Sequence, residues 1–328
     1  MASTPAAGGV LAAPAALKSV LRAAEAAAAL AAGVRASGVE AAELPIADGG
    51  DGTAEVLAAA LGGEWRTARA SDALGRSIEA RWLALPDGSA VVESAEAIGL
   101  RRLRPEELDP MRASSRGLGE LILAAVREHP QALIVCLGGS ATVDGGAGLL
   151  TVIDRLPAQT TVLQDVRTTL PDAARLYGPQ KGATPDQVEE LTRRLEATAA
   201  LRPYASLPGS GAAGGLGAAL AALGGELVPG ADFVLERTGF RERARAAALV
   251  VTGEGAVDET TLEGKAPGEA LRVCVEEGVR CAVFGGRILV DELPGAELHE
   301  LGGGPERAAE ALFALGRQLG EDLAHAVG

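Results

Sequence analysis

The stretch Ala132-Leu-Ile-Val-Cys-Leu137 runs directly into Gly138-Gly-Ser-Ala-Thr-Val-Asp-Gly-Gly146. An apolar run that ends in glycines and leads into a helical pattern, here from residue 147 onward, predicts a buried strand, a loop and a helix in that order. Three further apolar runs also predict strands: residues 10–13, 248–252 and 280–284. Strands that alternate with helices in this way predict an α/β fold with a doubly wound sheet.

The length of the chain indicates more than one domain. At 328 residues it exceeds the size that a single hydrophobic core usually serves. Residues 78–85 and 89–94 bracket Pro86-Asp87-Gly88 and predict a β-hairpin, which interrupts the alternation of strands and helices. We therefore assign residues 1–60, 110–150 and 245–328 to the doubly wound domain, and residues 61–109 and 151–244 to a second, smaller α/β domain inserted in it.

The composition argues against several classes of partner. A net charge of -14 repels the phosphates of nucleic acid, and an aromatic content of 2% leaves few rings that could stack on bases. No apolar stretch approaches the roughly 20 residues that span a bilayer, and we expect no signal peptide. Cys136, Cys274 and Cys281 stand far apart in apolar runs, which predicts reduced thiols in a core and a cytoplasmic protein.

Residues 138–146 form a candidate phosphate cradle. The segment follows a predicted strand and opens a predicted helix, so its backbone N–H groups can converge on an anion. Ser140 and Thr142 add hydroxyls, and Asp144 could reach a metal or a sugar hydroxyl. The alternative is a tight turn between strand and helix with no ligand.

Residues 47–53, Ala-Asp-Gly-Gly-Asp-Gly-Thr, place two carboxylates beside three glycines. Carboxylates near substrate phosphates are common ligands of Mg²⁺, so Asp48 and Asp51 suit a metal or a substrate hydroxyl. Asp-Gly is equally typical of turns, and Thr53 could simply cap the following helix.

Residues 252–267 place acids and one lysine on a long loop at the end of a predicted strand. In open α/β sheets such loops carry ligands. Lys265 could neutralise the charge of a transferring phosphoryl group, while Glu254 or Asp258 could bind a metal or orient a hydroxyl. A solvated, charged loop is the alternative.

Residues 209–214 match the GxGxxG pattern of dinucleotide-binding proteins, but the segment before them contains a proline and too few apolar residues for a buried strand. An NAD-dependent dehydrogenase is therefore a remote alternative, and we interpret this loop as a second anion or nucleotide contact. The sequence contains no GxxxxGK[ST] motif and no protein-kinase signature.

Taken in order, five segments of the chain resemble the bacterial glycerate kinase family: ADGGDGT at 47–53, LGGSATVDGGAG at 137–148, YGPQKGAT at 177–184, GSGAAGGLG at 209–217 and TGEGAVDETTLEGKAP at 252–267. The resemblance implies a flavodoxin-like domain with a smaller inserted α/β domain. It also implies ATP with Mg²⁺ as phosphoryl donor and D-glycerate or a related hydroxy acid as acceptor. The oligomeric state stays open, with a homodimer as one alternative.

Carried over by motif, the resemblance implies three groups of site residues. The catalytic candidates are Asp48, Asp144, Asp165, Lys181 and Lys265. The nucleotide-binding candidates are Gly138, Gly139, Ser140, Thr142, Gly209, Ser210, Gly211, Gly253, Glu254 and Gly255. The metal candidates are Asp51 and Asp258.

The chain also departs from the family pattern. Pro14-Ala15-Ala16-Leu17-Lys18-Ser19 stands where the family has a PDSFKG-like segment, so an Asp and a Ser are lost while Lys18 is kept. Val143 replaces an Asn, and the region between residues 150 and 160 is shorter than in relatives. Two hypotheses remain open: an active kinase, whose acceptor could be altered, and a protein that binds nucleotide without transfer. A purely structural protein is a third.

Overall fold

The computed structural model describes residues 8–17, 19–157 and 159–327. Lys18, which the sequence comparison singled out, lies outside these described residues. The chain divides into two compact units. Unit 1 comprises Met1–Asp48, Glu55–Gly62 and Ala231–Gly328, and unit 2 comprises Gly49–Ala54 and Gly63–Gly230.

Unit 1 contains a five-stranded parallel sheet in the order β11-β10-β9-β1-β2. Its strands are β1 (Val10–Ala12), β2 (Ala41–Glu43), β9 (Leu249–Glu254), β10 (Arg280–Gly285) and β11 (Ala296–Glu300). Counted along this unit alone, the strand order is 2-1-3-4-5, which is the order of flavodoxin-like sheets. The predicted flavodoxin-like fold is therefore confirmed.

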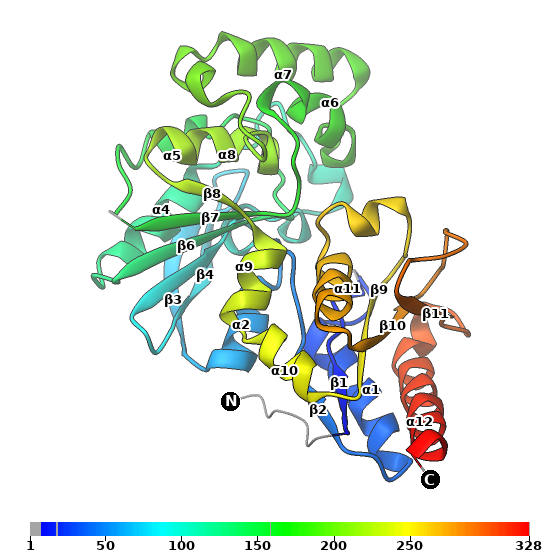
Figure 1. Ribbon diagram of the computed structural model, residues 1–328. Helices are drawn as coiled ribbons and strands as arrows, with labels where there is room; N and C mark the ends of the chain where they lie inside the picture. The colour runs from blue at the N-terminus through cyan, green and yellow to red at the C-terminus, as the bar shows by residue number, and fades with distance from the viewer. Residues whose placement is uncertain (1–7, 18, 158, 328) are drawn as a thin grey trace. The chain divides into compact units, whose positions relative to one another are not determined.

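Both faces of this sheet are buried because its strands are apolar on both sides. In β1, Val10 and Ala12 pack against α1 (Ala23–Ala36) and α12 (Ala308–Val327), while Leu11 contributes to the core on the opposite face. Figure 1 shows α12 in red beside α1 in blue. The opposite face is covered by helices α9 (Gly230–Arg237), α10 (Phe240–Ala246) and α11 (Ala266–Glu277) and by the end of α2 (Thr53–Leu61).

Glycines let α1 and α12 pack with their backbones in contact. A Cβ atom on Gly33 would collide with the carbonyl oxygen of Phe313, and one on Gly316 would collide with the carbonyl oxygen of Leu30. Larger side chains at these positions would force the helices apart. The small residues of both helices therefore set how closely they approach.

Unit 2 contains a six-stranded sheet in the sequential order β3-β4-β5-β6-β7-β8. Its strands are β3 (Glu64–Ser71), β4 (Ser77–Ala84), β5 (Ser89–Glu93), β6 (Ala132–Leu137), β7 (Thr160–Gln164) and β8 (Glu226–Pro229). The first three are antiparallel, so the predicted hairpin is confirmed, and β5 to β8 run parallel. Its helices are α3 (Ser94–Ile98), α4 (Arg116–Val126), α5 (Ala147–Leu150), α6 (Ala173–Tyr177), α7 (Pro185–Ala197) and α8 (Ala212–Ala222).

The domain assignment of residues 110–150 differs from the structure. Strand β6 pairs with β5, its partner in the hairpin sheet, and residues 110–150 belong to unit 2. An apolar strand before a glycine loop looks the same in either sheet, and only the pairing decides where it belongs. The inserted unit consequently holds the larger share of the chain, not the smaller.

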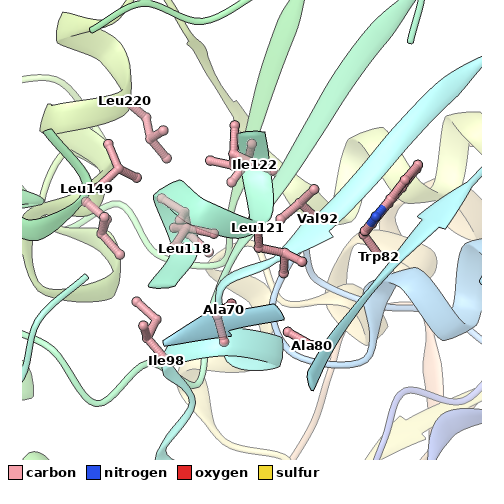
Figure 2. Close-up of a cluster of buried hydrophobic side chains, with 14 of the residues drawn as sticks. Ala70, Ala80, Trp82, Val92, Ile98, Leu118, Leu121, Ile122, Leu149 and Leu220 are labelled. Atoms are coloured by element: carbon pink, nitrogen blue, oxygen red, sulfur yellow. The ribbon is translucent and has the colours of Figure 1, made fainter. Parts of the chain in front are cut away.

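One core of unit 2 lies between the sheet and α4 (Figure 2). Leu118, Leu121 and Ile122 from α4 pack in the same cluster as Val92 of β5 and Trp82 of β4. All five are buried, and burying each large apolar side chain contributes about 1.5–3 kcal/mol. This packing holds β5, which pairs with β6, the strand that ends at the glycine loop of residues 138–146.

Two further observations bear on the predictions. The three cysteines are free and buried, as expected from their apolar surroundings. Among the residues that the structure describes, no helix combines the length and apolarity needed to cross a bilayer.

Candidate functional site

In unit 2, the polar segments singled out from the sequence meet at one edge of the sheet. Strands β5, β6 and β7 are parallel, so their carboxyl ends lie at the same edge. Glu93 ends β5, the loop of residues 138–146 follows β6, and Asp165 follows β7. This is the edge at which open α/β sheets carry their ligands.

The loop that follows β6 is held by the segment that follows β5. The hydroxyl of Ser94 donates to the carbonyl oxygen of Gly138 at 2.9 Å, and Leu100 N donates to the carbonyl oxygen of Gly139 at 2.7 Å. Ala141 N donates to the carbonyl oxygen of Ile98 at 2.8 Å. These hydrogen bonds fix the backbone of the loop at residues 138–141.

Residues 49–54 lie against this loop, so two motifs that are distant in the sequence come together. A Cβ atom on Gly138 would lie 2.6 Å from the Cα of Gly50, which explains the glycine at position 138. Asp51 lies next to Gly139, and its carboxylate is 3.0 Å from Arg101 Nη1.

Lys181 lies inside the cluster of loops. Its ammonium nitrogen donates to the Ser140 hydroxyl at 3.1 Å and to the carbonyl oxygen of Thr142 at 2.8 Å. The side chain is buried. Burial lowers the pKa of Lys181 to about 7, against the opposing effect of Asp144 and Asp165. The lysine is thus poised to gain a full charge when an anion approaches.

Thr142 supplies a second unusual group at the same place. Its residue is fully buried, and its Oγ1 has no hydrogen-bond partner among the described residues. A buried hydroxyl without a partner costs about 1–3 kcal/mol unless water or a ligand satisfies it. Ser140, Thr142 and Lys181 therefore form a buried polar cluster with hydrogen-bonding capacity to spare.

Asp144 has a different environment from the one that its motif suggested. Its carboxylate accepts hydrogen bonds from Ser115 N and Oγ, both at 2.8 Å, from Gly148 N at 3.0 Å and from Gly146 N at 3.1 Å. These bonds tie the glycine loop to Ser115, the residue that immediately precedes α4. The carboxylate therefore positions the loop.

The loop of residues 209–215 packs on the same cluster. The Ser210 hydroxyl accepts from Leu170 N and donates to the carbonyl oxygen of Ala205, both at 2.9 Å. Gly211 N donates to the carbonyl oxygen of Thr168 at 2.9 Å. Together these bonds hold the segment that begins at Asp165. The GxGxxG pattern thus follows a 3-10 helix and a turn, with no strand before it, as its sequence context predicted.

In unit 1, the predicted residues that follow β9 lie at the point where the strand order reverses. The loops after β1 and β9 leave neighbouring strands, and Ala15 N donates to the carbonyl oxygen of Gly253 at 2.9 Å. This topological switch point is where flavodoxin-like sheets bind ligands. The altered segment at residues 14–16 therefore borders the motif that begins at Thr252.

Lys265 is surrounded by acids in this part of unit 1. Its ammonium nitrogen is 3.2 Å from Asp258 Oδ1 and 3.8 Å from Glu254 Oε1, and Thr261 Oγ1 donates to the same Glu254 oxygen at 3.0 Å. A hydrogen bond from Thr260 and the charge of Lys265 lower the pKa of Asp258, despite some opposing desolvation. The loop presents a cation between two carboxylates.

A surface pocket of about 570 Å³ lies elsewhere in unit 1, between the end of β11 and α12. Glu300, Arg307 and Glu310 are among its lining residues. None of the residues predicted from the motifs lines it.

Comparison with known proteins assigns the chain to a family. The sequence model described as "Glycerate kinase family" matches residues 10–155 and 152–302. Glycerate kinase from Halalkalibacterium halodurans is 35% identical over 288 residues, which cover 75% of this chain and 76% of the relative. Glycerate 2-kinase from Escherichia coli K12 is 35% identical over 267 residues, covering 68% and 70%. This chain belongs to the glycerate kinase family.

A solved structure agrees with this assignment to the glycerate kinases. The crystal structure of a protein assigned as glycerate kinase 2 from Salmonella typhimurium LT2 superposes with a TM-score of 0.83 at 29% identity, covering 98% of this chain and 99% of that one. The family, the α/β fold and the classification of the chain as a kinase are thereby confirmed.

The sequence motifs did not identify an arginine and glutamate cluster beside the glycine loops of this glycerate kinase. Glu96 is buried and pairs with Arg81 at 2.8 Å, Arg101 at 2.9 Å and Arg102 at 3.3 Å. Burial alone would raise the pKa of Glu96, but the hydrogen bond and charge of Arg81 and the charge of Arg101 lower it below its usual value.

Glu93 was also missed, although it had a recognisable signal. It follows the apolar residues Ala90-Val91-Val92 directly, as Gly138 follows its own strand. Its carboxylate is buried and accepts a hydrogen bond from Ala54 N at 2.7 Å. A carboxylate at the end of a buried strand was the sign that could have identified it.

Proposed function

We propose that this chain transfers the γ-phosphoryl group of ATP, bound with Mg²⁺, to a hydroxyl of D-glycerate to give 2- or 3-phosphoglycerate. The observation that carries the proposal is the buried Lys181 at the centre of the glycine loops. Membership of the glycerate kinase family supports it. Glycerate kinase and glycerate 2-kinase are the names of the relatives described above.

In unit 2, Lys181 would interact with phosphoryl oxygens. Lys181 is buried, so its charge acts at a low effective dielectric constant and stabilises negative charge more than it would in water. Phosphate would raise the pKa of Lys181 and restore its full charge at neutral pH. Backbone N–H groups of Gly139 and Ser140 and the hydroxyl of Thr142 would add donors.

In unit 1, Lys265 is a second candidate cation for phosphoryl transfer. Its ion pairs with Glu254 and Asp258 orient it without burying it, because 29% of its side chain stays exposed. Transfer of a phosphoryl group depends mainly on positioning and on electrostatic stabilisation, which lysines provide.

Magnesium fits this protein only together with the nucleotide. Among the described residues, no three His, Cys, Asp or Glu side chains cluster so as to hold a metal. Mg²⁺ usually binds through one or two carboxylates and the substrate phosphates, so Asp51 in unit 2 and Asp258 in unit 1, each with 36% of its side chain exposed, are two separate candidate ligands. Bound there, the ion would neutralise charge on the phosphates.

The general base would be Asp48 or Asp165. Asp144 is less suited to proton transfer because four donors already occupy its carboxylate. Asp165 lies close enough to Lys181 for its charge to raise the pKa of the lysine.

A coupled assay of ADP release with ATP, Mg²⁺ and D-glycerate tests the proposal, and NMR of the product identifies the phosphorylated hydroxyl. Glycerate-dependent turnover that falls strongly in the Lys265→Met variant is the expected result. Without turnover in the wild type, but with ATP binding seen by calorimetry, the chain would be a nucleotide-binding protein that has lost transfer. The altered residues 14–16, next to Gly253, favour that second candidate.

A further inference from the structure

We propose that Glu93 and Ser94 are positioning residues that clamp the two glycine loops of unit 2 together. The two residues are adjacent at the end of β5, and each bonds to a different loop. The proposal rests on the proposed function only in that these loops are taken to bind the phosphates.

Glu93 holds the loop of residues 49–54. Its Oε1 accepts a hydrogen bond from Ala54 N at 2.7 Å, and only 4% of the residue is exposed. Ala54 is the last residue of the segment before the chain returns to unit 1 at Glu55. The bond therefore anchors the segment at the end where it leaves unit 2.

Ser94 holds the loop of residues 138–146. Its hydroxyl donates to the carbonyl oxygen of Gly138 at 2.9 Å and accepts from Gly138 N at 3.2 Å. The same side chain thus fixes both backbone groups of the first residue after β6. Ser94 is fully buried, so water does not compete for these bonds.

The two anchored loops meet at Gly50 and Gly138, where a Cβ atom on Gly138 would be 2.6 Å from the Cα of Gly50. The contact lies between the two anchors and depends on both. It also sets the position of Asp51, whose carboxylate is paired with Arg101. A shift of either loop would displace the N–H groups and the carboxylate that are proposed to face the nucleotide.

Glu93 faces Asp51, Glu96 and Arg101. Desolvation raises the pKa of Glu93 to about 8, against the hydrogen bond from Ala54 N, which lowers it. The clamp uses one acceptor oxygen of this side chain. A glutamine, which keeps the acceptor oxygen and the size, should replace it in the clamp.

Hydrogen exchange measured by mass spectrometry on the full chain, without nucleotide, tests the clamp. Glu93→Leu removes the acceptor, and we expect exchange in the peptide covering residues 49–54 to rise about tenfold, the equivalent of one hydrogen bond. Ser94→Ala should do the same for residues 138–141. Glu93→Gln should keep wild-type exchange, and Glu79→Leu, at an exposed position of β4, is the matched control.

Kinetics separates positioning from general stability. If ATP turnover is present, Glu93→Leu should raise the KM for ATP about tenfold and Glu93→Gln should restore it. Loop exchange in Glu93→Leu and Ser94→Ala that equals wild type overturns the clamp. So does faster loop exchange in Glu93→Gln, which remains measurable even where Glu93→Leu does not fold. Because exchange is measured without substrate, absence of kinase activity overturns the proposed function and leaves the clamp standing.

Discussion

The ammonium nitrogen of Lys181 donates a hydrogen bond of 3.1 Å to the hydroxyl of Ser140, and both side chains are buried. A lysine held in this way has a fixed position and almost no contact with water. Lys181 comes from a short 3-10 helix (Pro179–Lys181), and Ser140 comes from the loop after β6. The bond therefore joins two motifs across the inserted unit.

Replacing this lysine should affect catalysis far more than folding. Lys181→Met keeps the length and the apolar stem, so we expect the variant to stay folded at neutral pH. It removes the charge proposed to stabilise the phosphoryl group, which should lower kcat about 100- to 1,000-fold. A variant with wild-type turnover would show that Lys181 is only a structural residue.

In the ligand-free protein, the free energy of unfolding should depend on pH because Lys181 titrates differently in the folded and unfolded chain. Burial lowers its pKa from 10.5 to about 7, against the charges of Asp144 and Asp165, so between these values the unfolded chain binds the extra proton. This contribution to stability is full above pH 10.5 and is lost as pH falls towards 7. Urea titrations of wild type and Lys181→Met should diverge in this window, and parallel curves would contradict the prediction.

Ala213 should be a site where glycine stabilises the protein. Its φ of 52° and ψ of 35° lie in the left-handed region, beside Gly214 at φ 74°. A residue with a Cβ atom is destabilised by about 1–2 kcal/mol in this conformation. Glycine adopts it without that cost but loses more backbone entropy on folding. We expect Ala213→Gly to raise the free energy of unfolding by up to about 1 kcal/mol.

Gly214→Ala is the opposite test at the neighbouring position. The new Cβ would collide with the carbonyl oxygen of Thr142, so this variant should be strongly destabilised. Equal melting temperatures for Ala213→Gly and wild type would mean that residue 213 is not strained.

Asp144 should contribute mainly to stability. Asp144→Asn places an amide NH₂ against N–H donors of Ser115 and Gly148, which should cost about 2–4 kcal/mol in urea unfolding. Asp186→Asn in the exposed first turn of α7 is the control and should change stability by less than about 0.5 kcal/mol. If both variants are equally stable, the four hydrogen bonds of Asp144 make no net contribution to the free energy of unfolding.

Gly33 should be required for the packing of α1 on α12. In Gly33→Ala the methyl group would meet the carbonyl oxygen of Phe313, and the helices would have to separate, at a cost of about 1–3 kcal/mol. Gly302→Ala has open space around it and serves as the control. The midpoint of thermal unfolding should be lower for Gly33→Ala than for Gly302→Ala. Equal midpoints would contradict the close packing of α1 on α12.

Much of the secondary structure followed from local patterns. The strand Ala132–Leu137 lies where the apolar run before the glycines predicted it, and the helix Pro185–Ala197 also begins at local signals. Thr184 caps that helix by accepting from Gln187 N, as such a sequence favours. These features depend on neighbours in the chain, so the sequence carries them directly.

The long-range features did not follow in this way. Asp144 and Asp51 have the same chemistry in the sequence, but one is saturated by four donors and the other is paired with Arg101. Glu93 lacks a glycine motif and was overlooked. Gly146 and Gly148 are local partners of Asp144, but the other partners lie 29 to 50 positions away, which no local pattern encodes.

The sequence by itself determined which segments are strands, which loops carry glycine and acids, and which family the chain resembles. The tertiary structure decided which sheet β6 joins, which of the carboxylates are engaged and how Lys181 is buried. The physical reason is that strand pairing, burial and charge pairing arise from contacts between distant segments. Desolvation and hydrogen bonding at those contacts, not the identity of the side chain alone, set what each residue can do.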